Sequence, residues 1–215
     1  MAALNIAKYV DSESLQNRIY RVGIELEGGW NPLPEGASLI RDGSVSIDGS
    51  GSGSGSLKVG ELVSSPMEPI AVPKRIKKYH PTKANQTCGL HVHMSFTSAW
   101  HYQVLMSESF QATLLKELEK WGKQAGVPSG STFWDRVRGH NSYCTDRFYA
   151  DAQALATSKS FDRGREGNRY TAVNYCFGLH GTIECRVLPV FSDPELSIKA
   201  VEKVLAITNA CLMVL

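Results

Sequence analysis

The sequence lacks the features that are typical of membrane-spanning or nucleic-acid-binding proteins. No apolar run approaches the ~18 residues that span a bilayer, so we expect no membrane-spanning helix and no membrane partner. Lys and Arg total 23 against 21 Asp and Glu, and a net charge of +2 argues against nucleic acid as a main partner. Near the N-terminus, Asp11, Glu13 and Gln16 interrupt the apolar residues, so the segment has no signal-peptide core.

Paired cysteines and glycine-rich nucleotide loops are also missing. The five cysteines are odd in number and form no C-x-x-C pair, which argues against a disulfide framework or a cysteine-based zinc site. We therefore expect a reducing, cytoplasmic location. Neither G-x-x-x-x-G-K-[ST] nor G-x-G-x-x-G occurs, so any nucleotide would have to be held by metals and arginines.

The length and composition predict one domain over residues 1–215. With 42% hydrophobic residues, a chain of 215 residues can bury one good core. A perfect Gly-Ser repeat over residues 49–56 is typical of a flexible, engineered linker, so we exclude it from the fold prediction. The last predicted helix runs to Leu215 without a stop signal, and we expect the natural protein to continue beyond it.

The hydrophobic pattern predicts an α+β fold. Strands are expected at residues 20–27, 57–64, 89–96, 169–175 and 181–188, with a turn at residues 28–32 ending the first. Helices are expected at residues 74–80, 98–125 and 146–156 and from Pro194 onward. Because the strands come in local antiparallel pairs, we expect an antiparallel sheet with helices on one side and an open, concave, charged face on the other.

Three of these strands carry ionisable residues at every second position. They are Glu25 and Glu27, His91 and His93, and Glu184 with Arg186. Side chains alternate between the two faces of a strand, so each pair projects from one side and the intervening aliphatic residues from the other. If the three strands share a sheet, all six side chains line one face.

Two glutamates at this spacing indicate a cation site. Glu25 and Glu27 would lie about 7 Å apart on one face, where two unpaired carboxylates repel each other. A divalent cation removes that conflict, and oxygen ligands favour Mg²⁺ or Mn²⁺. Glu61, on the strand at residues 57–64, is a weaker candidate of the same kind. His91 and His93 are ligand or phosphate-contact candidates, and the planar fork of Arg186 suits phosphate oxygens.

Each candidate also has a simpler interpretation, which the sequence leaves open. The two glutamates of E-x-E can face solvent on an edge strand, and Glu184 with Arg186 can form an ion pair of little energetic value. Arg169 is either a second phosphate contact or a rim residue. Asp42 is a turn former first and a site candidate second, and the basic segment at residues 74–78 reads as a solvated surface.

Six motifs in order resemble the glutamine synthetase and glutamate–cysteine ligase superfamily of carboxylate–amine ligases, and most closely its amidoligase branch. They are G-I-E-L-E (Gly23 to Glu27), D-G-S (Asp42 to Ser44), G-E-L-V-S-S-P (Gly60 to Pro66), C-G-L-H-V-H (Cys88 to His93), R-Y-x-x-V-N (Arg169 to Asn174) and G-T-I-E-C-R (Gly181 to Arg186). The resemblance implies a glutamine synthetase-like catalytic domain whose antiparallel sheet holds ATP and divalent metals on its concave face.

The resemblance also assigns roles by position. The implied metal ligands are Glu25, Glu27, Glu61, His91 and Glu184. The implied phosphate contacts are His93, Arg169 and Arg186, and Asp42 would lie near the incoming amine. The expected function is ATP- and Mg²⁺- or Mn²⁺-dependent ligation of a small-molecule or peptide carboxylate to an amine through an acyl phosphate.

Two other functions fit the same residues. A zinc hydrolase would use His91, His93 and one glutamate as ligands and another glutamate as general base. A non-catalytic module would bind a nucleotide or a phosphorylated ligand without turnover. The sequence identifies neither the carboxylate nor the amine, and it does not indicate the oligomeric state.

Overall fold

The structure is a computed structural model, and it describes most of the chain. The described residues are 3–6, 9, 18–41, 43–48, 56–148, 170–176 and 180–214. Asp42, Arg169 and almost all of the Gly-Ser repeat lie outside these ranges, as does most of the helix expected at residues 146–156.

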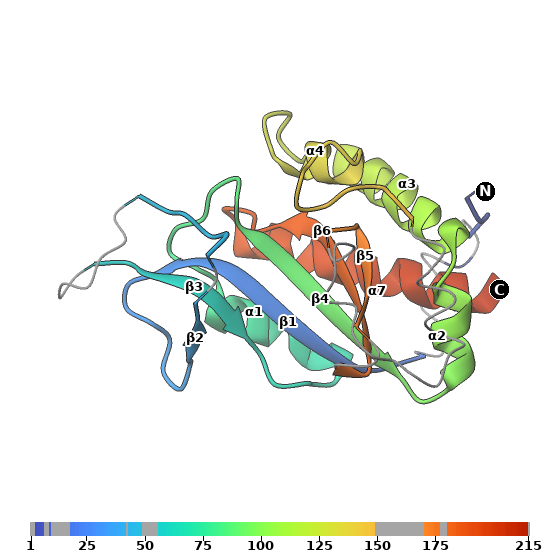
Figure 1. Ribbon diagram of the computed structural model, residues 1–215, viewed down its shortest axis with the longest axis horizontal. Coiled ribbons are helices and arrows are strands. Elements are labelled where there is room, and N and C mark those ends of the chain that lie inside the picture. The colour runs from blue at the N-terminus through green and yellow to red at the C-terminus, as the bar shows by residue number, and fades with distance from the viewer. Residues whose placement is uncertain are drawn as a thin grey trace.

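A six-stranded antiparallel sheet forms the centre of the molecule (Figure 1). Its strands are β1 (Ile19–Trp30), β2 (Leu39–Ile40), β3 (Lys58–Val63), β4 (Gly89–Phe96), β5 (Val173–Cys176) and β6 (Thr182–Pro189). Their order across the sheet is β2-β3-β1-β4-β6-β5, and every pairing is antiparallel. The longest strand, β1, therefore lies between β3 and β4, near the middle.

The helices confirm the α+β class. They are α1 (Val72–Tyr79), preceded by the 3₁₀ turn η1 (Pro69–Ala71), α2 (Ala99–Leu105), α3 (Glu108–Gln124), α4 (Phe133–Val137) and α7 (Pro194–Val214). In Figure 1, α1 and α7 lie behind the sheet, while α3 and α4 lie along its upper side. Among the described helices, none combines the length and apolar character needed to cross a bilayer.

One face of the sheet, which we call the helix face, belongs to the apolar core. Its side chains include those of Ile24, Leu26, Val92, Met94 and Ile183, all at most 1% exposed. They pack in a single hydrophobic cluster with residues of α1, α3 and α7. Cys185 is buried in the same cluster, which confirms the expectation that its thiol fills space in the core.

The helix expected at residues 98–125 is two helices in the structure. Met106 has φ −81° and ψ 53°, which ends α2. The Ser107 side chain then accepts a hydrogen bond from the Phe110 backbone N–H and begins α3, as Ser98 does for α2 through Trp100. The hydrophobic stripe continues across the break, so periodicity alone suggested one helix. A serine inside the pattern supplied the competing N-cap.

The first strand also extends beyond its predicted end. Residues 28 and 29 were expected in a turn, but they pair with β3 opposite Gly60 and Val59. A Cβ at Gly28 would lie 2.4 Å from the Cβ of Pro81, so glycine allows that close approach within a strand. Gly28 therefore marks tight packing rather than a turn.

Candidate metal centre

The pairing register brings the predicted site residues onto one face of four neighbouring strands. Glu25 of β1 is opposite His91 of β4, and His93 of β4 is opposite Glu184 of β6. On the other side of β1, Glu27 is opposite Glu61 of β3. We call this side of the sheet the charged face. It is the side opposite the helix face, because these residues alternate with the buried aliphatic ones.

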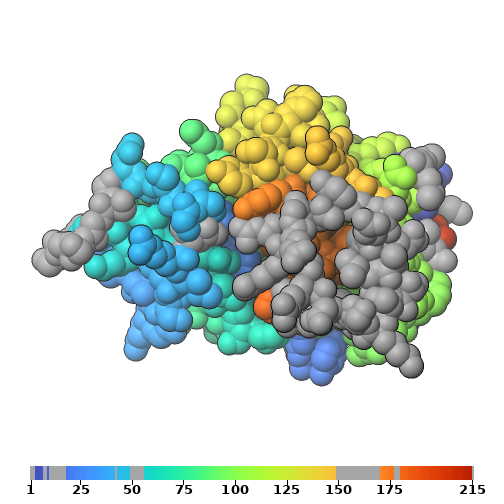
Figure 2. All heavy atoms as spheres, viewed as in Figure 1, coloured from blue at the N-terminus to red at the C-terminus, as the bar shows by residue number. Residues whose placement is uncertain are grey.

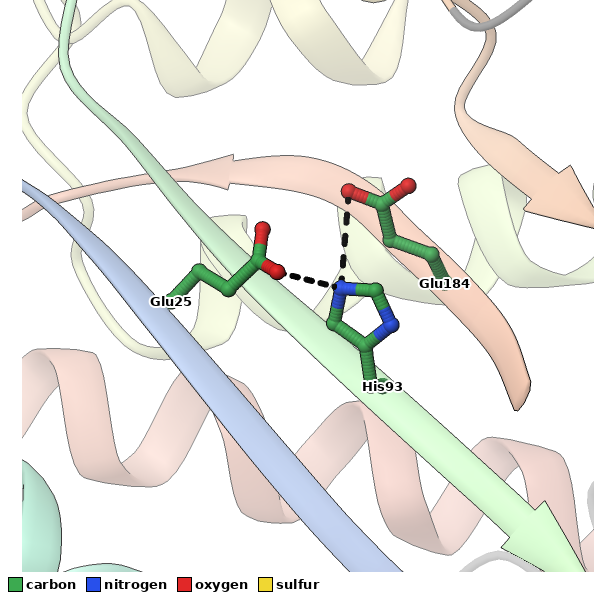
Figure 3. Close-up of side chains that lie close together, drawn as sticks. All are labelled: Glu25, His93 and Glu184. Atoms are coloured by element: carbon green, nitrogen blue, oxygen red, sulfur yellow. Dashed lines mark ion pairs between the residues drawn. The ribbon is translucent and has the colours of Figure 1, made fainter. Parts of the chain in front are cut away.

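His93 lies between two glutamates from the neighbouring strands. Its Nε2 is 2.9 Å from Glu25 Oε1 and 3.8 Å from Glu184 Oε1, and both carboxylates point toward the ring (Figure 3). Its Nδ1 lies 3.0 Å from the hydroxyl oxygen of Thr182, at the start of β6. The ring is thereby fixed at Nδ1, while its buried Nε2 faces the two carboxylates without a hydrogen-bond partner.

His91 makes a similar set of contacts one pleat along β4. Its Nδ1 is 3.1 Å from Glu25 Oε2 and 3.3 Å from Glu184 Oε1, and its Nε2 is 3.9 Å from Glu27 Oε1. The two oxygens of Glu25 therefore face different histidines, Oε1 toward His93 and Oε2 toward His91. A carboxylate in this position can bridge two cations.

Two sets of donor atoms are close enough to hold a metal ion. Glu25, His93 and Glu184 form one set, and Glu25, Glu61 and His91 form the other, with the atoms of each set within 4.8 Å of one another. Each set has two carboxylates and one imidazole. This oxygen-rich composition fits Mg²⁺ or Mn²⁺. His93, which was expected at a phosphate, belongs to one of the two donor sets, and its phosphate role stays a prediction.

Glu27 lies beside the two donor sets without belonging to either. Its Oε2 accepts a short hydrogen bond from the backbone N–H of Gly89. A Cβ at Gly89 would lie 2.6 Å from His91 Nε2 and 3.1 Å from Glu27 Oε2. Glycine at the start of β4 therefore leaves the space that the imidazole and the carboxylate occupy, which explains a part of the C-G-L-H-V-H motif.

Three polar groups fix the Glu184 carboxylate. Arg186 Nη1 donates to its Oε1 over 2.7 Å, and Asn174 Nδ2 donates to its Oε2 over 2.8 Å. The Cys176 thiol also donates to Oε2, at 3.5 Å. Neither Asn174 nor Cys176 was predicted as a site residue. Their two-residue spacing on β5 was the available signal, since it places both side chains on the charged face.

Burial and mutual contact shift the proton affinities of these groups. Burial acts to raise the pKa of Glu25, but His91 and His93 outweigh it, and the net pKa lies below the usual range. Burial likewise raises the pKa of Glu184, and the charge of Arg186, with those of the histidines, lowers it overall. For His93, burial lowers the pKa but its contact with Glu25 prevails, so the net pKa is raised. Both carboxylates are therefore ionised at neutral pH.

The centre of the charged face is buried, so the expectation of an open face is wrong there. Glu27, His91, His93 and Glu184 are all buried, with Glu184 only 3% exposed. These side chains contact one another, and Asn174 and Cys176 of the neighbouring strand β5 donate hydrogen bonds to Glu184. Figure 2 shows this side of the molecule, where atoms of β2 and β3 lie to the left and those of the α3–α4 segment above.

A buried arginine that sequence analysis missed lies next to this cluster. Arg136, on the short helix α4, donates from Nη1 to the carbonyl oxygen of Arg186 over 3.1 Å. Its side chain is 1% exposed, and its charge interacts favourably with Glu27. No periodic pattern singles out one residue in a helix of this length.

The remaining candidates lie elsewhere. Asp42 and Arg169 are outside the described residues, so their predicted roles stay predictions. The basic residues 74–78 belong to α1, behind the sheet in Figure 1.

Comparison with protein-family models, with curated proteins and with solved structures gives no match. The interpretation of the site therefore rests on its own geometry and chemistry.

Proposed function

We propose that the chain is a carboxylate–amine ligase of the amidoligase kind, which uses ATP and two Mg²⁺ or Mn²⁺ ions. The observation that carries this proposal is the pair of donor sets that share Glu25, each oxygen of that carboxylate facing a different histidine. Bound ions would neutralise charge on the phosphates of ATP during transfer. Four carboxylates on one face are more than a single cation requires.

The reaction has two steps that balance without a protein nucleophile. A carboxylate oxygen of the first substrate forms a bond to the γ-phosphorus of ATP, and ADP leaves. The amine nitrogen of the second substrate then attacks the acyl carbon, inorganic phosphate leaves, and the nitrogen loses a proton. In this scheme Arg186 and Arg169 hold the moving phosphoryl group and Asp42 lies near the amine. The protein contributes positioning and fixed charge.

The arrangement of the histidines favours this function over a zinc hydrolase. A hydrolase would need both imidazoles and one glutamate around a single ion. Here His91 and His93 belong to different donor sets, each completed by two carboxylates. Arg186, held against Glu184, adds a guanidinium that a phosphate can use and a hydrolytic zinc does not require.

The test is ATP turnover with Mg²⁺ and a panel of carboxylate and amine pairs. We expect ADP release that depends on both substrates, and a loss of about a thousandfold in Glu184→Gln, because the variant keeps the shape of the side chain without its charge. Glu202→Gln, on the exposed side of α7, is the matched control and should keep full turnover. Circular dichroism checks that both variants fold.

Each rival function predicts a different result. Stoichiometric zinc in protein purified without added metal would favour hydrolysis. ATP binding with no ADP release under any substrate pair would favour a non-catalytic module. Unchanged turnover in Glu184→Gln would remove the site assignment itself.

A further inference from the structure

Arg136 is buried more completely than any other charged side chain among the described residues. It comes from α4, outside the strands that build the donor sets. The one hydrogen bond of its side chain to a described residue runs from Nη1 to the carbonyl oxygen of Arg186, and its Nε–H is buried without a partner. It forms no ion pair with any described carboxylate. Burying a guanidinium without a paired carboxylate lowers the free energy of unfolding.

The charge that offsets this cost lies in the candidate metal centre. Burial lowers the pKa of Arg136 overall, and the like charge of Arg186 adds to that effect; Cys144 and then Glu27, the one carboxylate among the causes, act against it. Glu25, Glu61 and Glu184 add three further carboxylates to the same face. Within the part of the chain that the structure describes, the direct counter-charges of Glu184 are Arg186 and the two histidines. Arg136 is thus joined to this cluster of carboxylates through its hydrogen bond to the Arg186 carbonyl oxygen.

We propose that Arg136 is a positioning residue for the anionic ligand of this site. It holds the β6 backbone at the residue whose side chain reaches Glu184, and it places a fixed positive charge behind the donor sets. This inference deepens the proposed function and rests on it, since the anion in question is the phosphate chain of a nucleotide. Arg136 acts through Arg186 and through the local potential rather than by touching the reacting atoms.

A fixed charge has opposite effects on cations and anions, which separates this role from a purely structural one. Removing the positive charge of Arg136 should strengthen the binding of a metal ion alone, because repulsion between two cations is lost. The same change should weaken the binding of a nucleotide, because attraction for the phosphates is lost. Loss of packing alone would weaken both, since it would loosen β6 and every donor on it.

The experiment compares Arg136→Gln, which removes the charge but keeps an N–H donor, with Arg136→Lys, which keeps the charge. Isothermal titration calorimetry measures Mn²⁺ alone, and then a non-hydrolysable ATP analogue at saturating Mn²⁺. In Arg136→Gln we expect Mn²⁺ affinity to rise and analogue affinity to fall, each by about tenfold. In Arg136→Lys both affinities should stay within about threefold of wild type. Arg138→Gln, two residues along on an exposed side chain, is the control and should change neither.

The outcomes distinguish this inference from the proposed function. A parallel fall of both affinities in Arg136→Gln, or no change in either, overturns the inference. If Arg136→Gln does not fold, Arg136→Lys tests the inference. A role limited to the hydrogen bond from the guanidinium to the Arg186 carbonyl oxygen predicts that both affinities fall in Arg136→Lys. Wild-type protein that binds neither Mn²⁺ nor the analogue would refute both proposals. Binding with the opposed shifts but no ligation would refute the ligase alone.

Discussion

The two faces of the sheet are built from the same strands and have opposite properties. On β1, Ile24 and Leu26 point to the helix face, and Glu25 and Glu27 point to the charged face. On β4, Val92 lies between the two histidines in the same way. A shift of one residue in pairing register would exchange the faces, so the apolar side chains that fix the register also fix the site.

The two faces also differ in what they contribute to stability. A fully buried aliphatic side chain contributes about 1.5–3 kcal/mol to folding, whereas a buried carboxylate costs free energy unless charged or polar partners surround it. Glu25, Glu184 and the two histidines supply partners for one another. The helix face therefore stabilises the fold, whereas the charged face carries the candidate metal centre. Single substitutions on β1 can test this separation.

The largest effect is expected from Glu25→Gln on the charged face. This side chain belongs to both donor sets, so the variant loses a ligand in each, and we expect Mn²⁺ affinity to fall by about a thousandfold, or ~4 kcal/mol. Calorimetric titration with Mn²⁺ gives both the affinity and the number of ions bound per chain.

Glu61→Gln is the matched variant for Glu25→Gln, because Glu61 belongs to only one donor set. We expect it to reduce the number of Mn²⁺ ions bound from two to one while the remaining ion keeps its affinity. If both variants lose one ion each, Glu25 does not bridge two sites and the two sets do not share it.

The next largest effect is expected one residue away, on the helix face. Leu26 is 1% exposed within the core, so Leu26→Ala should lower the free energy of unfolding by about 3 kcal/mol through lost burial and a cavity. Mn²⁺ affinity should stay within about threefold of wild type. Urea unfolding measures the first quantity and calorimetry the second. A loss of metal affinity as large as that in Glu25→Gln would show that the two faces are not separable.

The alternation of residue types predicted the candidate site because it depends on a single local rule. In a strand, residues two apart share a face whatever their neighbours are, so Glu25 with Glu27 and His91 with His93 could be paired before any fold was known. The same rule placed Cys185 in the core. The α+β class and five of the six strands followed from local patterns for the same reason; the two-residue strand β2 was not expected.

What the sequence did not reveal depends on contacts between distant segments. Arg136 reaches the site from α4 through a backbone carbonyl of β6, and no spacing in the sequence encodes that contact. The Glu184 carboxylate accepts hydrogen bonds from Asn174 and Cys176 of the neighbouring strand β5, which its own strand does not encode. The end of α2 at Met106 reflects a competition between a continuing hydrophobic stripe and the Ser107 N-cap, which periodicity cannot decide.

The smallest effect expected is on the pH dependence of stability. It concerns one histidine from the charged face, His93, and one from among the helices, His80, whose pKa values shift in opposite directions. Contact with Glu25 raises the pKa of His93 on the charged face against the effect of burial. His80, at the end of α1, lies among the helices with its Nε2 3.4 Å from the Ser197 hydroxyl oxygen. There burial prevails over contacts with Pro81, Phe191 and Asp193, and the pKa of His80 falls below 6.5.

The lowered pKa of His80 in the folded state determines whether the free energy of unfolding rises or falls with pH. The unfolded chain protonates His80 first, so the stability that the neutral side chain contributes is complete above pH 6.5 and is lost as the pH falls through the folded-state pKa. Urea unfolding of wild type and His80→Gln between about pH 8 and pH 5 measures this, because every other titrating group is common to both proteins and cancels. We expect the wild type to lose stability relative to the variant as the pH falls, with a slope below one proton per molecule. A relative gain at low pH would mean that His80 is stabilised in its charged form, and the contrast between the two regions would then not extend to their histidines.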